Sequence, residues 1–220
     1  MVSPCEDDVL TRALQRIVSD ALHAPDVSAV VLCPHAALVD VFLKALQTRL
    51  PASSIPRVTT LAHWAAEQPP DGRVVPDIER LSLVFGALRE RRWFEYQDHW
   101  ILAREALELV DEMTRWGFVM PREAAAFVDN LNQAYEARQG TLFLLEARFV
   151  HELWWVLHQD PLELSPAMAY QQQLVRLAAR NSAGRCYLVA PGTLTPAEVA
   201  CVAALEEGMC VTRFEQTLPG

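Results

Sequence analysis

Lysine and glycine-rich loops are scarce in this sequence. Lys44 is the only lysine among 220 residues, and it precedes every glycine. A P-loop needs glycines that bring backbone N–H groups onto phosphate and a lysine that reaches it, so a P-loop is excluded. The dinucleotide fingerprint G-x-G-x-x-G is also absent. The residue two before Lys44 is Phe42, which excludes the carboxylate–lysine pair of a PD-(D/E)XK nuclease site.

Composition narrows the classes further. A hydrophobic fraction of 51% with 21% charged residues is typical of a compact globular protein. The net charge of -9 disfavours nucleic-acid binding by charge alone. The five cysteines form no C-x-x-C pair, and Cys33 and Cys186 lie in apolar runs, which predicts reduced, buried thiols. We expect a cytoplasmic chain with no signal peptide, no membrane span and no cofactor.

Both ends of the chain show an α/β pattern. Residues 29–33 form a short apolar run closed by Pro34, which predicts a buried parallel strand, and helical periodicity follows from His35. Residues 57–60 predict a second strand, with Thr60 capping the next helix. Near the other end, strands are expected at 185–190 and 210–214, separated by a helix whose capping box is Thr195 and Glu198.

The middle of the chain predicts only helices. Residues 68–76 form a linker rich in proline, and residues 77–181 show helical spacing without a convincing strand. The clearest helix runs from Trp100 to Trp116, with Gly117 at its C′ position. Its expected buried face consists of Leu102, Ala106, Leu109, Met113 and Trp116. Other helix starts are expected at Asp7 or Asp8 (N-cap), Pro121 (N1) and Ser165-Pro166 (N-cap and N1).

The predicted fold is therefore α/β but mostly helical overall, with a parallel sheet layer interrupted by an all-helical insertion. Its expected parts are residues 1–67, residues 77–181 and residues 185–220. The chain stops just after a strand, which predicts truncation at Gly220.

Several residues are candidates for binding. His35 lies at a strand-to-helix turn, where open α/β sheets place ligands, although it can instead simply cap the helix. His151 and His158 are seven residues apart, too far for one metal ion, and are expected to be partly exposed helix histidines. The tryptophans can stack on bases but at helical spacing are more typical of core. Four carboxylates at helical spacing are expected on one solvated helix face: Glu105, Glu108, Asp111 and Glu112. A basic cluster lies beside an aromatic residue: Arg89, Arg91 and Arg92 beside Trp93.

The stretches VVLCPHAALVDVFLKAL and PRVTTLAHWAAE resemble the N-terminal helicase-like region of AddB/RexB-type double-strand break repair proteins. The blocks ERLSLVFGALRERRWF, LLEARFVHELWWVLHQ and CYLVAPGTLTPAEVACVAAL are similar to that family in the same order, so the resemblance covers roughly residues 25–215. Members of this family are large polypeptides with a PD-(D/E)XK nuclease domain near the C-terminus.

The resemblance implies a P-loop-NTPase-like, helicase 1A-type layer with a 1B-like helical insertion. It also implies that residues 32–37 and 57–61 lie along single-stranded DNA. The nucleic-acid-binding candidates are then His35, Arg57, Thr59, Thr60, Arg91, Arg92 and Trp93. Many relatives carry arginines where this chain has His35-Ala36-Ala37, and the phosphate-binding lysine is missing. The resemblance thus implies a helicase fold that does not hydrolyse ATP, with any nuclease domain beyond Gly220.

The leading hypothesis is a non-catalytic helicase-like domain of a DNA repair helicase–nuclease, serving as scaffold and single-stranded DNA tracking surface beside a partner helicase subunit. No catalytic residue is expected within the segment itself. The alternative is a stand-alone α/β and helical protein-interaction module without DNA binding, which the acidic balance favours. A small-molecule enzyme ranks last, because no nucleophile–base pair is evident.

Overall fold

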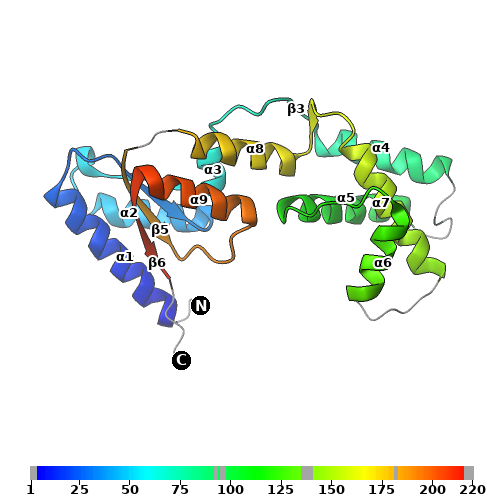
Figure 1. Cartoon of the computed structure of the whole chain (residues 1–220). Helices are drawn as coiled ribbons and strands as arrows, with labels where there is room; N and C mark the ends of the chain where they lie inside the picture. The colour runs from blue at the N-terminus through cyan, green and yellow to red at the C-terminus, as the bar shows by residue number, and fades with distance from the viewer. Residues whose placement is uncertain (1–3, 92–93, 95–97, 135–140, 181–182, 216–220) are drawn as a thin grey trace. The chain divides into compact units, whose positions relative to one another are not determined.

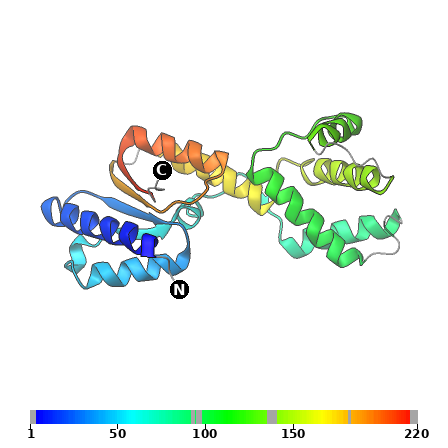
Figure 2. The ribbon, with the colours of Figure 1, turned by 90° about the horizontal axis from the view of Figure 1, so that it is seen from below.

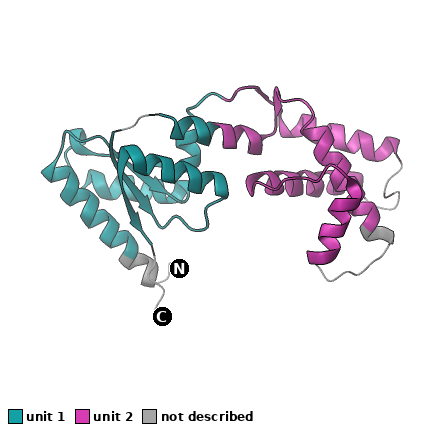
Figure 3. Cartoon of the chain, viewed as in Figure 1, with its two compact units in different colours: residues 1–69, 173–220 teal, residues 70–172 magenta. Residues whose placement is uncertain are grey.

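The chain divides into two compact units in a computed structural model (Figures 1 and 3). The structure describes residues 4–91, 94, 98–134, 141–180 and 183–215. We call residues 1–69 with 173–220 the sheet unit and residues 70–172 the helical unit. Most of the described residues are helical.

The sheet unit contains four parallel strands in the order β2-β1-β5-β6. These are β1 (Ala29–Cys33), β2 (Arg57–Thr60), β5 (Gly184–Val189) and β6 (Met209–Phe214). In the two central strands, β1 and β5, the last four residues are all buried, as expected for a strand covered on both faces. The predicted α/β class with a parallel sheet is confirmed.

Helices cover both faces of this sheet. The chain moves outward from β1 to β2 through α2 (Ala36–Gln47), and outward from β5 to β6 through α9 (Pro196–Gly208). Because such crossovers are right-handed, opposite directions place the two helices on opposite faces. Figure 2 shows α2 together with α1 (Pro4–His23) on one side of the sheet and α9 on the other. On the α1 and α2 side, Ile17, Phe42, Leu46, Val31 and Tyr187 belong to one buried cluster.

Two short helical elements complete the outer part of this unit: η1 (Ala52–Ser54) and α3 (Leu61–Ala65). Thr60 caps α3 as predicted, and its hydroxyl oxygen accepts a hydrogen bond from the His63 N–H at 3.0 Å. The predicted capping box of α9 is present, with Thr195 and Glu198 each accepting from the other's backbone N–H.

The helical unit is built from four helices and the first part of a fifth over its described residues. They are α4 (Asp77–Glu90), α5 (His99–Arg115), α6 (Ala124–Ala134), α7 (Thr141–Leu157) and the start of α8 (Pro166–Ala178). Its core gathers Val84, Leu88, Leu107, Val110 and Phe149. Ser165 caps α8 as predicted, its hydroxyl accepting from the Met168 N–H at 3.1 Å.

One pair of strands in the helical unit was not predicted. β3 (Arg73–Val74) pairs in parallel with β4 (Glu163–Leu164) as a separate two-stranded sheet. Two-residue strands carry no alternation that a sequence pattern can detect. The expectation of helices alone in residues 77–181 is therefore wrong at β4.

Two helix starts were also predicted wrongly. α1 begins at Pro4, so Asp7 and Asp8 lie inside the helix rather than at its cap. α6 begins at Ala124, three residues beyond Pro121. The first turn of a helix tolerates proline, but a proline does not by itself start a helix, because its fixed φ also suits extended segments.

The buried face of α5 agrees only in part with the predicted one: Ala106 is buried, and Leu102 and Met113 pack against the core. Leu109 is 45% exposed and Trp116 46% exposed. The face turned inward instead carries Ala103, Leu107 and Val110. Small residues let helices approach closely, which a pattern based on large apolar residues overlooks. Leu109 is thus left at the surface of α5.

Candidate nucleic-acid interface

The carboxyl edge of the sheet is where the sequence places its main candidates. In the register of β1 and β2, Cys33 lies opposite Thr60, so the two strands end side by side. The directions of the crossovers diverge between β1 and β5, which are neighbours. In open α/β sheets, ligands bind beyond the carboxyl ends of the strands at such a switch point.

His35 is exposed at this edge and caps α2. Its backbone is extended, and its Nδ1 atom accepts a hydrogen bond from the Leu38 N–H at 3.3 Å. The prediction that His35 caps the helix is confirmed. An accepting Nδ1 carries no hydrogen, so the neutral ring has its proton on Nε2, which can donate to a phosphate oxygen.

Thr59 and Thr60 differ in their access to this edge. Thr60 is partly exposed, and its hydroxyl hydrogen is available because the oxygen accepts from the helix backbone. Thr59 is only 4% exposed, and its hydroxyl donates to the Thr60 carbonyl at 3.4 Å. A buried hydroxyl cannot reach a DNA strand on the surface, so Thr59 does not join His35 and Thr60.

Arg57 lies at the opposite end of the same strand. It begins β2, and three residues of extended chain span about 10 Å. Its guanidinium pairs with both carboxylate oxygens of Glu67, one of them at 2.9 Å. This hydrogen bond lowers the pKa of the Glu67 carboxyl. Arg57 is therefore neutralised and is not gathered with His35 at the carboxyl edge.

The basic cluster at the end of α4 is only partly described. Arg92 and Trp93 lie outside the described residues. Arg91 forms an ion pair with Glu152, and the Arg89 guanidinium carbon lies 5.7 Å from the centre of the Phe85 ring. Two of the three arginines thus have partners within the helical unit.

The tryptophans of the helical unit are less buried than expected. Trp154 is buried, whereas Trp100, Trp116 and Trp155 are 41–46% exposed. Each exposed ring still has a neighbour: Trp100 stacks on Phe85 with ring centres 4.0 Å apart. The indole N–H groups of the other two donate to Glu112 and His151.

A cleft at the amino edge of the sheet was missed by sequence reasoning. It encloses about 330 Å³ and is lined by Asp20, Arg57, Arg185 and Tyr187 among others. The Tyr187 hydroxyl donates to Asp20 Oδ2 at 2.8 Å, and Arg16 Nε donates to the same atom at 2.9 Å. Arg185 and Tyr187 alternate along the apolar strand β5, and that alternation is the only sequence signal.

Titration in this cleft follows its hydrogen bonds. Burial raises the pKa of Asp20, but hydrogen bonds from Tyr187 and Arg16 outweigh it and leave the pKa lowered. Burial and donation to Asp20 raise the pKa of Tyr187 to about 12. The pair therefore ties α1 to β5 at neutral pH, which is a structural role.

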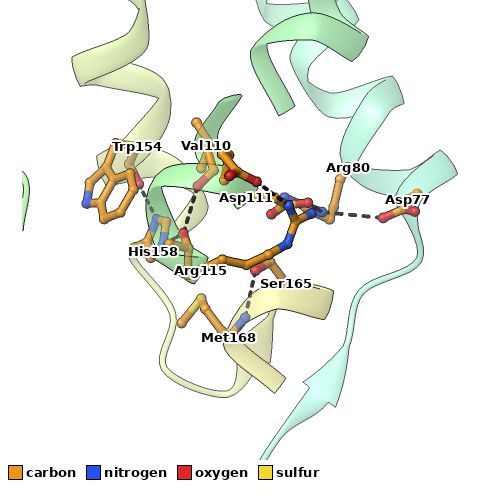
Figure 4. A network of polar contacts seen from close by, with 11 residues as sticks. Asp77, Arg80, Val110, Asp111, Arg115, Trp154, His158, Ser165 and Met168 are labelled. Carbon is orange, nitrogen blue, oxygen red and sulfur yellow. Dashed lines mark hydrogen bonds and ion pairs between the residues drawn. The ribbon is translucent and has the colours of Figure 1, made fainter. Parts of the chain in front are cut away.

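The helical unit encloses a buried ion pair (Figure 4). Arg80 is only 4% exposed and donates to both carboxylate oxygens of Asp111, at 2.7 and 2.9 Å. Asp77 also accepts from Arg80, at 3.3 Å. Asp111 was expected on a solvated face, and this expectation is wrong: its side chain is 13% exposed.

His151 of α7 and His158, which directly follows α7, each lie against a backbone carbonyl oxygen. His151, which is buried rather than partly exposed as expected, lies with Nε2 2.9 Å from the Pro121 carbonyl oxygen. His158 Nδ1 lies 2.8 Å from the Trp154 carbonyl oxygen, and burial lowers the pKa of this imidazole. No group of three or more His, Cys, Asp or Glu side chains is placed to hold a metal ion in the part of the chain that the structure describes.

Burial raises the pKa of three cysteine thiols. It raises the pKa of Cys33 and of Cys186 to about 12, and that of Cys201 to about 11. The predicted burial of Cys33 and Cys186 is confirmed. In the described residues, no helix combines the length and the hydrophobicity that crossing a bilayer requires.

Charge is distributed unequally between the units. The helical unit contains 17 acidic and 10 basic residues, a net charge of -7. The sheet unit contains 11 acidic and 9 basic residues, a net charge of -2. A polyanion therefore meets less repulsion at the sheet unit than at the helical unit.

Comparison with known proteins adds no relative: no protein-family model matches this chain, and neither does any curated protein.

Proposed function

We propose that this chain is a non-catalytic helicase-like domain of a DNA double-strand break repair helicase–nuclease, as its resemblance to AddB/RexB-type proteins implies. In this proposal the sheet unit is a P-loop-NTPase-like, 1A-type layer, and the helical unit is its 1B-like insertion. The carboxyl edge of the sheet binds single-stranded DNA, and a partner helicase subunit supplies ATP hydrolysis.

The observation that carries the proposal is the pairing of His35 and Thr60 at one edge. Thr60 is the last residue of β2, and His35 follows the end of the adjacent strand β1, which lies about 4.8 Å away; both present a hydrogen-bond donor there. The N-terminus of α2 begins directly after His35, and its partial positive charge favours phosphate. These groups suit a backbone that is held without reading its bases.

The missing lysine determines what such a site can do. The turn after β1 has no lysine, so it lacks the side chain that reaches the phosphates of a nucleoside triphosphate in a P-loop. The domain would hold a DNA strand while the partner subunit moves it. This scaffold role requires no catalytic residue in the segment.

A matched pair of variants tests the proposal. Aspartate and asparagine both cap helices well, so His35→Asn and His35→Asp preserve α2 and differ only in charge. Binding to fluorescein-labelled oligo-dT is followed by anisotropy over a potassium chloride series. We expect His35→Asp to weaken binding about tenfold relative to His35→Asn, because its carboxylate faces phosphate.

Two results would contradict the proposal. The first is no oligo-dT binding by the unaltered chain at low salt. The second is equal binding by the two His35 variants, which would move any DNA contact away from the carboxyl edge. Leu22→Ala, at a 57% exposed position of α1 next to Ala21 of the cleft at the amino edge, serves as the control that leaves affinity unchanged.

The net charge of -7 on the helical unit favours a second candidate, a protein-interaction module that never meets DNA. The size of the native polypeptide separates the two. An immunoblot of source-cell extract showing a band several times heavier than 24.7 kDa supports the repair protein, and a band at 24.7 kDa supports the independent module.

A further inference from the structure

The helical unit carries an apolar surface that is separate from the carboxyl edge of the sheet. It is a groove of about 340 Å³ between α5, α6 and α7. We call it the α5 groove and define it by its lining residues: Leu109, Met113, Phe118, Phe127, Leu131, Glu146, Ala147 and Val150. Seven of these eight side chains are apolar.

The α5 groove lies at the edge of the core of the helical unit, where the core covers the apolar residues of α5 only in part. One face, with Ala103, Leu107 and Val110, packs into the core of the unit. Met113 packs against the same core, whereas Leu109 is 45% exposed and Phe118, beyond the helix end, is 38% exposed. An amphipathic helix needs only one apolar stripe to fold onto its own core. The exposed part of this edge, Leu109 and Phe118, therefore costs solubility unless another group covers it.

The charge around the groove indicates what could cover it. Glu146 lines the groove itself, and Glu105 and Glu112 lie four residues before and three residues after Leu109, on the same face of α5. Arg104 and Arg115 pair with Glu108 and Glu112. Among the described residues, no ion pair involves Glu105 or Glu146, so both carboxylates are available to a basic partner.

We propose that the α5 groove binds an amphipathic helix with a basic flank from a partner protein. Leucine-sized side chains at i, i+3, i+4 and i+7 of such a helix fill an apolar groove, which is a recurrent mode of peptide recognition. Lysine or arginine beside them meets Glu105 and Glu146. The same acidity, within a unit of net charge -7, opposes a nucleic acid or an anionic membrane as occupant.

The proposal does not depend on DNA binding. Its residues belong to the helical unit alone, whereas His35 and Thr60 belong to the sheet unit. A peptide assay and an oligo-dT assay can therefore fail or succeed separately.

The test uses the full chain and two designed peptides of about 18 residues with the same leucine spacing, one flanked by lysines and one by glutamates. Fluorescence anisotropy of the labelled peptides measures affinity. We expect the lysine peptide to bind at least about tenfold more tightly than the glutamate peptide. Leu109→Gln should weaken the lysine peptide about tenfold, because it removes an exposed apolar anchor without changing charge.

Matched variants separate the groove from the rest of the surface. Leu83→Gln makes the same change at a leucine of α4 that is 52% exposed and outside the groove, and it should leave peptide affinity unchanged. Glu146→Lys should reduce the preference for the lysine peptide or reverse it. Circular dichroism checks that each variant retains its helices.

Three results would overturn the proposal. The lysine peptide fails to bind at millimolar concentration, or both peptides bind equally, which would indicate an apolar cleft without charge selection. Alternatively, sedimentation equilibrium shows a dimer of this chain that Leu109→Gln dissociates. That result would identify a second copy of the chain as the occupant.

Discussion

The two units place their charges in opposite ways. The sheet unit keeps arginine at its margins, where Arg57, Arg185 and Arg213 pair with carboxylates at partly exposed positions. The helical unit buries a whole guanidinium, with Arg80 4% exposed against Asp111. Exposed pairs contribute little to stability, whereas a buried charge depends on its partner. The helical unit thus depends on a buried charge pair, whereas the charge pairs of the sheet unit lie at partly exposed positions.

The largest test of this contrast removes the partner of Arg80. Asp111→Ala leaves a buried guanidinium facing Asp77 alone and should destabilise the helical unit by about 3–5 kcal/mol. Calorimetric unfolding should show the transition of that unit moving to lower temperature.

The control for Asp111→Ala replaces both charged residues of the pair by apolar ones. Replacing both partners, as Arg80→Met with Asp111→Leu, should recover most of the lost stability, because no unpaired charge stays buried. A double variant as unstable as Asp111→Ala would show that packing, and not charge, is responsible. Glu108→Ala, at an exposed pair 4.0 Å from Arg104, should change stability by less than about 0.5 kcal/mol.

A smaller loss of stability is expected from a substitution at a strained backbone position of the sheet unit. Gly184 has φ +136°, and a Cβ there would lie 2.2 Å from the Ser28 carbonyl oxygen. Gly184→Ala should therefore cost about 2–3 kcal/mol and lower the transition of the sheet unit.

The same substitution in the helical unit should have the opposite sign. Gly86 lies inside α4, and a Cβ added there would meet no atom within 4 Å, so Gly86→Ala should raise stability by about 0.5–1 kcal/mol. Urea unfolding of both variants measures the two signs. A loss of stability in both would mean that helix propensity does not limit α4.

The smallest effect is a pH dependence in the helical unit. Burial lowers the pKa of His158 below its ordinary value of 6.5, so the unfolded chain binds the proton more readily than the folded one. Stability from this group is complete above pH 6.5 and falls as the pH drops through that value towards the lowered pKa. Urea unfolding at about pH 7.5 and about pH 5.5 should show the loss, and His158→Gln should reduce it. An unchanged pH dependence in that variant would assign the loss to other groups.

Features that depend on residues close together in the sequence were predicted, whereas contacts between distant segments were not. The strands at Ala29–Cys33 and Gly184–Val189 are apolar runs closed by proline, and both were predicted close to their observed bounds. The caps at Thr60, Thr195 and Ser165 depend on residues three positions away and were also predicted.

The contacts that failed prediction join distant segments. Arg80 meets Asp111 across 31 positions, and Tyr187 meets Asp20 across 167. Nothing in a local window states that Asp111 turns inward while Glu108 and Glu112 stay in water. The candidate site divided in the same way: the cap at His35 was predictable, whereas the burial of Thr59 and the pairing of Arg57 with Glu67 were not.

The small β3–β4 pair has a consequence for how the chain can vary. Arg73 N–H donates to the Leu162 carbonyl at 2.8 Å, and Val75 N–H donates to the Leu164 carbonyl at 3.0 Å. Gly72 allows this approach, since a Cβ there would lie 2.4 Å from the Leu162 oxygen. The chain therefore leaves the helical unit beside the point where it entered. The β3–β4 pair fixes the distance between the segments that enter and leave the helical unit. The helices between them can therefore gain or lose turns without changing that distance.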